Sequence, residues 1–342
     1  MGFVLVVNAG STSLKLSSVA SDGSAEPVAS LDASPADVEA VAHRVVHGGS
    51  RFRDPMLIDE EVERELEALK ELAPLHNGPA LVAIEEARRV LPGVPHVAVF
   101  DTAFHATLSE EAATYAVPKH WRDEWHIRRY GFHGLSVQWA AEQVPVERLV
   151  VCHLGGGCSV TAVRDGRSVD TTMGFSPLEG VPMATRSGSV DPEVVLHLIR
   201  KQKLQPDEVE WGLGHESGLL GLSGLTSRVD LLERSDAPDA QLALSVFVHR
   251  VAGAVGAMVA SLDGIDALVF TAGVGEGSAA MRERICGRLG FLGIELDEEA
   301  NRNAEPDCDI AAAGTGVRVV VLHAREDLVA ARAARALLGT AR

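Results

Sequence analysis

VLVVNAG at residues 4–10 and LVVCHLGGG at residues 149–157 decide the fold of this chain. Each is a run of apolar, largely β-branched residues that ends in a turn of small residues, which predicts a buried strand and a tight turn. A second strand-like run follows each of them, LKLSSVA in the first case and CSVTAVR in the second. Asp-Gly turns at 22–23 and 165–166 then close the two units, and they lie 143 residues apart, close to the 145 that separate Gly10 from Gly155. Hairpins of this kind are common, but the matched turns favour two copies of one domain over a short-period repeat.

A third apolar run, DALVFTAGVGEGS at residues 266–278, also ends in glycines and is followed by a helix-like stretch. A strand, a glycine turn and a helix N-terminus in this order are typical of an anion- or nucleotide-binding site. The spacing is GxGxG rather than GxGxxG, and the sequence contains no Walker motif, so this signal is weak by itself. The first turn, NAGSTS, also differs from a dinucleotide fingerprint, which disfavours a nicotinamide-dependent dehydrogenase.

Helix-like segments separate the predicted strands. They cover residues 60–72, 79–90, 136–143, 191–201, 240–261 and 326–338. Their alternation with short apolar strands predicts an α/β protein, and a length of 342 residues suits two domains of ordinary size.

The composition excludes several classes of protein. A formal net charge of −17 argues against nucleic acids and anionic membranes as partners, because both are polyanions. The four cysteines contain no CxxC pair, which is typical of a reduced cytosolic chain. The start, MGFVLVVNAG, lacks the basic region of a signal peptide, and the most apolar later stretch, residues 251–262, is too short to cross a bilayer. We therefore expect a soluble, cytoplasmic protein.

Two charged residues interrupt apolar strands. Arg44 lies within VAHRVVHGG at residues 41–49, where its guanidinium must meet a buried anion, either a structural carboxylate or a substrate. Asp101 ends the apolar strand of VAVFDTAFH at residues 97–105, where α/β enzymes place chemistry, although a turn or helix-capping aspartate is an equal alternative. Residues alone leave both alternatives open.

Two further side chains are weaker candidates. His133 lies between two glycines in YGFHG, and a lone histidine is more often structural than catalytic. Arg186 lies among small residues in MATRSGSVDP, which leaves its head group accessible. The thirteen histidines form neither an HExxH motif nor a Cys/His spacing, so structural zinc is rejected.

Taken in order, these segments resemble the acetate kinase family, within the superfamily of duplicated ATPase domains that includes actin and the sugar kinases. The resemblance runs nearly end to end and covers VLVVNAGSTSLK, HRVVHGG, LAPLHN, VFDTAFH, YGFHG, CHLGGGCSV, DTTMGFSPLEG, TRSGSVDP, SGLLGLSG, VFTAGVGEGS and REDLVAAR. It implies two ribonuclease-H-like, actin-like ATPase domains with mixed sheets and an interdomain cleft. Residues 1–140 plus 328–342 would form the first domain and residues 141–327 the nucleotide-binding second domain.

The implied reaction is reversible transfer of the γ-phosphoryl group of ATP to acetate, giving acetyl phosphate and ADP. The implied cofactor is Mg²⁺, with Mn²⁺ as a substitute, and the implied assembly is a homodimer. One alternative is a kinase for propionate, butyrate or another short acid, or one that uses a different phosphoryl donor. Another is a non-catalytic nucleotide-binding protein of the same fold.

The resemblance also assigns residues. The implied catalytic residues are Asn8, Arg44, Asp101, His133 and Arg186. The implied acid-binding residues are Arg44, Val46, Leu75, Phe132 and Pro177, an arginine for the carboxylate and apolar walls for a short alkyl group. The implied nucleotide-binding residues are Lys15, His153, Gly155, Gly157, Arg228, Asp230, Gly273, Val274, Gly275 and Glu276. The implied Mg²⁺ ligands are Asn8 and Glu326, since this ion prefers oxygen.

The sequence departs from the family pattern mainly in the nucleotide-binding segments. Gly156 and Gly277 each stand where the family has asparagine, and Arg228 and Asp230 are exchanged relative to the family order. Val137 and Ser189 replace a histidine and an aspartate. The transfer residues are retained, so we expect the chemistry to be kept and leave open whether ATP is the donor.

Overall fold

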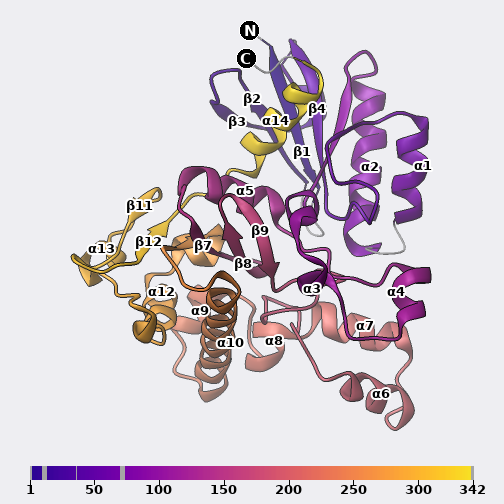
Figure 1. The fold of residues 1–342 in the computed structure, drawn as a ribbon. Helices are drawn as coiled ribbons and strands as arrows, with labels where there is room; N and C mark the ends of the chain where they lie inside the picture. Colours follow the sequence, from indigo (N-terminus) through magenta and orange to yellow (C-terminus); the bar gives the residue numbers. More distant parts are fainter. Residues whose placement is uncertain (1, 10–13, 36, 70–73, 340–342) are drawn as a thin grey trace. The chain divides into compact units, whose positions relative to one another are not determined.

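The computed structural model describes residues 2–9, 14–35, 37–69 and 74–339, and the chain packs as two compact units (Figure 1). The first comprises Met1–Ala106, Phe132–Trp139 and Arg325–Arg342, and the second comprises Thr107–Gly131 and Ala140–Ala324. The boundaries predicted from sequence assign 107–131 and 140 to the first domain and 325–327 to the second, whereas 107–131 and 140 pack with the second unit and 325–327 with the first.

The first unit is built on a six-stranded mixed sheet in the order β3-β2-β1-β4-β6-β5. The strands are β1 (Phe3–Ala9), β2 (Leu14–Val19), β3 (Ala25–Val28), β4 (Val38–Val45), β5 (Met56–Leu57) and β6 (His96–Phe100). β1, β4 and β6 run parallel to one another, whereas β2, β3 and β5 are antiparallel to their neighbours.

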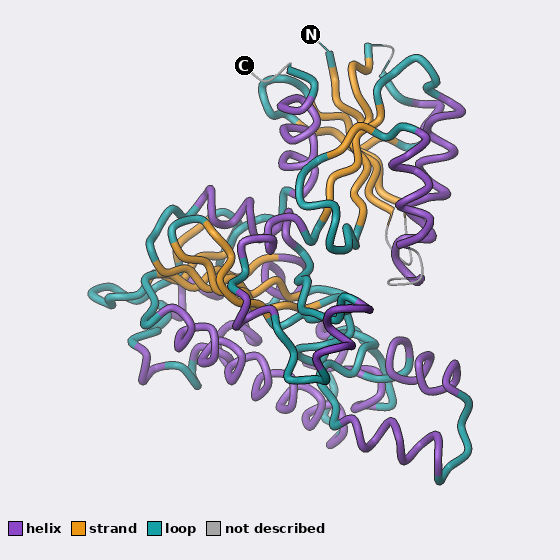
Figure 2. Tube along the Cα trace, turned by 45° about the vertical axis from the view of Figure 1, so that its right-hand side comes forward, coloured by secondary structure: helices purple, strands orange, loops and turns teal. Residues whose placement is uncertain are grey.

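Helices cover both faces of this sheet (Figure 2). Successive side chains of a strand point to opposite faces, so the β1 residues Val4 and Val6 face a cluster that contains α14 (Glu326–Leu337). Leu5 and Val7 face a second cluster that contains α2 (Pro74–Val90). All four of these side chains are at most 2% exposed, which explains the uninterrupted apolar run of β1.

The remaining helical elements that begin in the first unit are η1 (Leu31–Ala33), α1 (Glu60–Ala68), η3 (Ala103–Thr107) and α5 (Gly134–Gln143). The predicted helix at 60–72 is confirmed through Ala68, and residues 70–73 lie outside those described. The helix predicted to begin at Pro79 begins at Pro74 and contains Pro79 in its second turn. A proline at this position removes an N–H that would otherwise donate within the helix, so α2 lacks one hydrogen bond there.

The second unit repeats the same sheet in the order β9-β8-β7-β10-β12-β11. Its strands are β7 (Arg148–Leu154), β8 (Cys158–Arg164), β9 (Arg167–Thr171), β10 (Ala267–Thr271), β11 (Cys308–Asp309) and β12 (Arg318–Val321). β10 is parallel to β7 and β12, and the other pairings are antiparallel, as in the first unit. The duplicated α/β fold predicted from the two glycine hairpins is confirmed.

The two Asp-Gly sites differ in detail. In the second unit, Asp165 and Gly166 have φ values of 49° and 74° and join β8 to β9 as a two-residue hairpin turn. In the first unit, residues 20–24 form a longer connection, in which the N–H of Ala20 donates to the Ser24 carbonyl at 2.9 Å. The Gly10 turn used in the sequence comparison lies outside the described residues.

The second unit carries the following helices: α3 (Glu110–Ala113), α4 (Lys119–Trp125), α6 (Pro192–Arg200), α7 (Pro206–His215), α8 (Gly218–Ser223), α9 (Val229–Glu233), α10 (Pro238–Leu262), α11 (Ala272–Gly277), α12 (Ala279–Cys286), η4 (Gly290–Leu292) and α13 (Glu298–Arg302). The predicted glycine turn after β10 is therefore helical, because α11 begins directly after the strand. α10 is 25 residues long, and an 18-residue window within it reaches a mean hydropathy of 1.7 with half of its residues buried. It packs against β8 and α8, which accounts for its apolar character as a core helix.

Candidate active site

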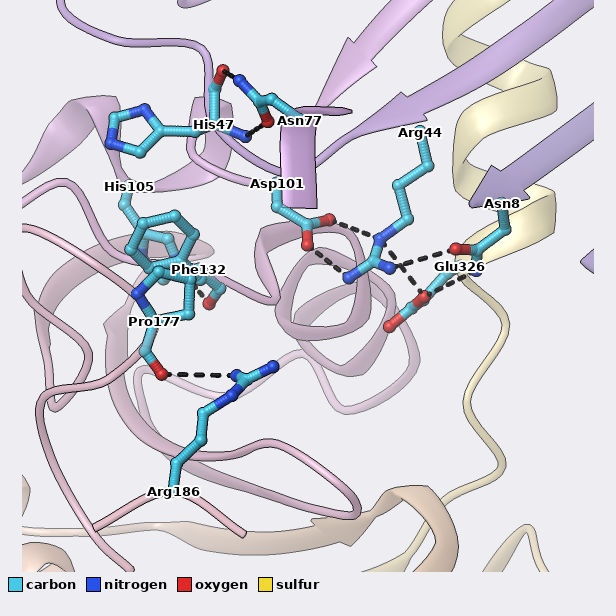
Figure 3. Close-up of polar contacts among 10 residues, drawn as sticks. All are labelled: Asn8, Arg44, His47, Asn77, Asp101, His105, Phe132, Pro177, Arg186 and Glu326. Atoms are coloured by element: carbon cyan, nitrogen blue, oxygen red, sulfur yellow. Dashed lines mark hydrogen bonds and ion pairs between the residues drawn. The ribbon is translucent and has the colours of Figure 1, made fainter. Parts of the chain in front are cut away.

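A polar cluster lies at the carboxyl ends of β1, β4 and β6, three neighbouring parallel strands of the first unit (Figure 3). Asn8 on β1 is in register with Arg44 on β4. Asp101 directly follows β6, and its N–H donates to the Val45 carbonyl at 3.0 Å. The carboxyl ends of parallel strands meet at one edge of a sheet, so sheet topology brings these three side chains together.

Arg44 and Asp101 form a bidentate ion pair. The Nε of Arg44 donates to Oδ1 of Asp101 at 3.0 Å, and its Nη2 donates to Oδ2. The Asp101 side chain is fully buried, and 14% of the Arg44 side chain is exposed. Of the two partners that the sequence allows for Arg44, the structure shows the structural carboxylate, and Asp101 is the residue that supplies it.

Asn8 and Glu326 complete the cluster. Nη1 of Arg44 donates to Oδ1 of Asn8 at 3.0 Å, and Nδ2 of Asn8 donates to Oε2 of Glu326 at 3.4 Å. The same Glu326 oxygen lies 3.6 Å from Nε of Arg44. Glu326 is the first residue of α14, so the end of the chain returns to the edge of the sheet that its beginning forms. The structure thus brings together four of the residues assigned from sequence.

Burial and charge perturb the pKa values in this cluster. Burial, with a contribution from the nearby Glu326 charge, raises the pKa of Asp101 to about 6, although Arg44 and the backbone N–H of His133 oppose the shift. Burial lowers the pKa of Arg44, but the charges of Asp101 and Glu326 outweigh it and raise that pKa above its ordinary value. With both carboxyl groups ionised, one cation faces two anions, and this surplus of negative charge favours a further cation.

The segment that contains His133 crosses directly over Asp101. The N–H of Gly134 donates to the Asp101 carbonyl at 3.0 Å, and a Cβ at Gly134 would lie 2.0 Å from that oxygen. Only glycine fits this approach. His133 has a φ of 59° and is 9% exposed, so its backbone is fixed in the left-handed region beside the ion pair.

The residues assigned to the apolar pocket fall in different parts of the chain. Val46 and Phe132 are buried in the first unit, with 5% and 1% of their surfaces exposed. Leu75 lies on α2, and its side chain is outside the description. Pro177 is buried in the second unit. Lys15, assigned to the nucleotide, is exposed on β2 opposite Asn8.

In the second unit, two glycine-rich segments lie side by side. His153 is the penultimate residue of β7 and is 8% exposed, and the turn that follows is closed by the Gly155 N–H, which donates to the Gly157 carbonyl at 3.0 Å. A Cβ at Gly155 would lie 3.4 Å from Cβ of Ala272, the first residue of α11. The turn after β7 and the helix after β10 therefore meet at the edge of the second sheet.

Glu276 stabilises the start of α11. Its Oε1 accepts hydrogen bonds from the N–H groups of Ala272 at 2.9 Å and Ala324 at 3.0 Å, and its Oε2 lies 2.6 Å from Nδ1 of His323. Arg282, which the sequence reasoning missed, is 2% exposed and donates to the Gly275 and Glu276 carbonyls at 2.9 and 2.8 Å. The Arg282 side chain thus caps the C-terminal end of α11, and the sequence carries no signal for these bonds.

Arg186 belongs to the second unit. Its Nη1 donates to the Pro177 carbonyl at 3.3 Å (Figure 3). The N–H of Met183 donates to the Arg186 carbonyl at 3.0 Å, and the N–H of the neighbouring Ala184 donates to the Gly156 carbonyl at 3.3 Å. These bonds tie Arg186 to both the glycine turn after β7 and the segment of Pro177.

The structure shows the contacts of each residue that departs from the family pattern. Arg228 and Asp230 are exposed at the start of α9 and bind each other, with Nη2 and Oδ2 2.7 Å apart. A Cβ at Gly156 or Gly277 would meet no atom within 4 Å, so neither glycine is required by packing. Val137 is fully buried in α5, and Oγ of Ser189 accepts from the Gly180 N–H at 3.1 Å.

Within the described residues, no group of three or more His, Cys, Asp or Glu side chains is arranged to hold a metal ion by itself. Mg²⁺ is usually bound through one or two carboxylates together with water and substrate phosphates. The oxygen atoms of Asn8 and Glu326 and the negative surplus around them fit this mode of binding. All four cysteines, each within the described part of the chain, are free thiols.

Comparison with known sequences places these features in context. The sequence profile of the acetokinase family matches residues 28–332. An acetate kinase of a Synechococcus species is 49% identical over 314 residues, which cover 89% of this chain and 77% of that protein. An acetate kinase of a Nostoc species is 46% identical over 304 residues, covering 85% of this chain and 74% of that protein.

Solved structures show the same likeness. A propionate kinase from Francisella tularensis superposes with a TM-score of 0.90 at 32% identity, covering 97% of this chain and 99% of that chain. An acetate kinase from Porphyromonas gingivalis superposes with a TM-score of 0.86 at 30% identity over the whole of both chains.

Proposed function

The chain belongs to the acetokinase family and is an acetate-kinase-like phosphotransferase with a carboxyl group as acceptor, and on that premise we propose the substrates and the roles of its residues. Acetate is the preferred acid, ATP is the phosphoryl donor, and acetyl phosphate and ADP are the products. The single observation that carries this proposal is the cluster of Asn8, Arg44, Asp101 and Glu326 at the edge of the first sheet.

Phosphoryl transfer needs positioned positive charge more than covalent chemistry, because charge spreads over the oxygens of the transferring group. Arg44 meets this requirement. A guanidinium has five N–H donors, and the hydrogen bonds to Asp101 and Asn8 engage three of them. Among the described residues, no bond engages the second hydrogens of Nη1 and Nη2, so we assign them to the acid carboxylate or an oxygen of the transferring group.

Asp101 acts mainly through Arg44. Both of its carboxylate oxygens contact the guanidinium, so it fixes the plane in which Arg44 presents its remaining donors. His133 and Arg186 supply further donors to the transferring group in this proposal. Asn8 binds near the same group. We assign Val46, Leu75 and Phe132 of the first unit to the alkyl part of the acid, and Pro177 of the second unit to the same role.

The second unit binds the nucleotide. The N-terminus of α11, which lies beside the turn of Gly155 and Gly157, presents backbone N–H groups of the kind that hold phosphates. We assign His153, Gly273, Val274 and Gly275 to this site. Glu276 contributes to nucleotide binding indirectly, because its hydrogen bonds hold α11 in position. We assign Lys15, Arg228 and Asp230 to the nucleotide as peripheral residues.

Mg²⁺, replaceable by Mn²⁺, would be held by Asn8 and Glu326 together with nucleotide phosphates. It would supply positive charge that neutralises the phosphate oxygens during transfer.

Acetate is proposed over longer acids on the names of the more identical relatives, while the propionate kinase neighbour makes propionate the second candidate. One added methylene changes selectivity by only about 1–3 kcal/mol, so residue types alone do not rank the acids. We further propose a cytoplasmic homodimer that forms through the second unit.

The test is an assay of the purified protein with Mg²⁺, ATP and hydroxylamine, and with acetate, propionate or butyrate as the acid. Acyl hydroxamate and ADP should appear in equal amounts, with acetate giving the highest kcat/KM. ADP without hydroxamate would contradict acyl phosphate formation. If ATP fails, GTP and pyrophosphate are tried next, and failure with all three would favour a nucleotide-binding protein without turnover.

A further inference from the structure

His47 and Asn77 form a buried connection between the segments that supply the predicted acid pocket. The His47 N–H donates to Oδ1 of Asn77 at 3.1 Å, and Nδ2 of Asn77 donates to the His47 carbonyl at 3.0 Å (Figure 3). The Asn77 amide thus pairs with the backbone of His47 on both sides. The two residues are 0% and 1% exposed, so water cannot substitute for these bonds.

His47 and Asn77 are each close in sequence to a residue of the predicted acid pocket. His47 directly follows Val46, and Asn77 lies on α2 two residues after Leu75. The paired amide therefore fixes the backbone of one pocket segment against the helix that carries another.

The His47 ring reaches a third pocket residue. Its centroid lies 5.3 Å from that of the Phe132 ring, at an interplanar angle of 73°, which is an edge-to-face contact. The Gly49 N–H donates to Nδ1 of His47 at 2.9 Å, so Nδ1 carries no proton in this arrangement and the ring orientation is fixed. Phe132 is also held through its backbone, because its carbonyl accepts from Nε2 of His105 at 2.9 Å.

We propose that His47 and Asn77 are positioning residues that set the width of the acid pocket and thereby the chain length of the acid the enzyme prefers. Asn77 fixes the backbone beside Val46, and the His47 ring limits how far Phe132 can retreat from a longer alkyl chain. This inference rests on the proposed function, since it assumes that Val46 and Phe132 line the acid site. Neither residue contacts the substrate in this account.

Two substitutions separate the ring of His47 from its turn. In His47→Asn, Oδ1 can still accept from the Gly49 N–H, as in an Asx turn, but the ring beside Phe132 is lost. In His47→Phe, the ring remains but the acceptor for Gly49 is lost. Both keep the backbone bonds to Asn77. His126→Asn is the matched control, because His126 is exposed in the second unit and has a φ of 52°, which asparagine tolerates.

We expect His47→Asn to raise the ratio of kcat/KM for propionate over acetate about tenfold, within the range that one methylene commands. Most of the change should appear in KM for the acid, and KM for ATP should stay within about twofold. His47→Phe should keep the wild-type ratio, even if its melting temperature falls. Asn77→Ala should shift the ratio in the same direction as His47→Asn.

Val46→Ala separates failure of this inference from failure of the proposed function. If Val46→Ala relaxes the acid preference while folded His47→Asn and Asn77→Ala keep the wild-type ratio, the positioning role is overturned and the pocket stands. If all three variants keep the wild-type ratio, both the pocket assignment and the inference are wrong. A parallel shift in His47→Phe would also refute the role assigned to the ring contact.

Discussion

Replacing Asp101 by asparagine tests whether Arg44 is effective only when it is held in place. The substitution keeps the shape of the side chain but removes the charge that faces Arg44 at 3.0 Å. At an effective dielectric constant of about 20, two charges at that distance attract by roughly 5 kcal/mol. Removing one partner of a buried pair costs about 3–5 kcal/mol, because the other charge is left uncompensated. Burial offsets this attraction, as the raised pKa of Asp101 shows, and Glu326, 3.6 Å from Arg44, still faces the guanidinium, so we expect the free energy of unfolding to change by less than about 2 kcal/mol.

The catalytic effect of the same substitution should be larger than its effect on stability. An amide has one acceptor oxygen, so it cannot accept from both Nε and Nη2 of Arg44, and the plane of the guanidinium is no longer fixed. We expect kcat/KM for acetate to fall roughly 10²–10³-fold, the usual loss for one preorganised donor. The hydroxamate assay measures activity and urea denaturation measures stability, with the exposed Asp54→Asn as control. A folded Asp101→Asn variant with wild-type kcat/KM would refute the role given to the ion pair.

The pH dependence gives an independent readout of the same residue. Because burial raises the pKa of Asp101 to about 6, the wild-type carboxylate gains a proton as the pH falls through about 6, and the pairing with Arg44 is lost. The kcat/KM of the wild type should therefore decline below about pH 6, and this decline should be absent in Asp101→Asn. An identical acidic limb in both proteins would assign the titration to another group.

Three further outcomes are expected. Arg186→Ala should lower kcat roughly 10²–10³-fold, whereas the exposed Arg200→Ala should not; equal turnover in both would remove Arg186 from the site. Gly156→Asn should fold normally, because a Cβ there meets no atom within 4 Å. Its amide should add one hydrogen bond to the nucleotide and lower KM for ATP roughly 2–10-fold, and an unchanged KM would count against nucleotide binding at this turn. Burial lowers the pKa of His43 and lowers that of His105 to about 4, so the unfolded chain takes up protons first as the pH falls below 6.5. The unfolding free energy should then fall from pH 6.5 towards 4, as measured by urea denaturation, and less steeply in His105→Asn; Asp101, with a raised pKa, contributes with the opposite sign.

The sequence predicted the strands and the polar residues at their ends, but not which of these residues bind one another. Arg44 interrupts an apolar strand, so the sequence predicted that it binds an anion. The identity of that anion depends on the β4–β6 pairing, which joins residues 57 apart. Glu326 is 318 residues from Asn8, and only the return of α14 to the first sheet brings them together.

Two helix boundaries were mispredicted because glycine and proline usually interrupt helices. The start of α2 was placed at Pro79, although the helix begins at Pro74. The glycines of α11 indicated a turn, yet the segment is helical because Glu276 and Arg282 hold its two ends. Asn77 lies in the LAPLHN segment that carries the family resemblance, but the sequence did not identify its partner. Its partner is the backbone of His47, and every residue has such a backbone, so no residue type in the sequence could mark the contact.

Duplication explains how one fold supplies both halves of the proposed reaction. β1, β4 and β6 of the first unit correspond in sheet order to β7, β10 and β12 of the second. The carboxyl ends of the first set carry an amide, a guanidinium and a carboxylate, which suit an acid and a transferring phosphoryl group. The ends of β7 and β10 instead lead into the Gly155 turn and into α11, a helix N-terminus of the kind that binds phosphates. In the proposed function, corresponding edges of the two sheets therefore serve different ligands, and the difference lies in whether charged side chains or the backbone of small residues follow the strands.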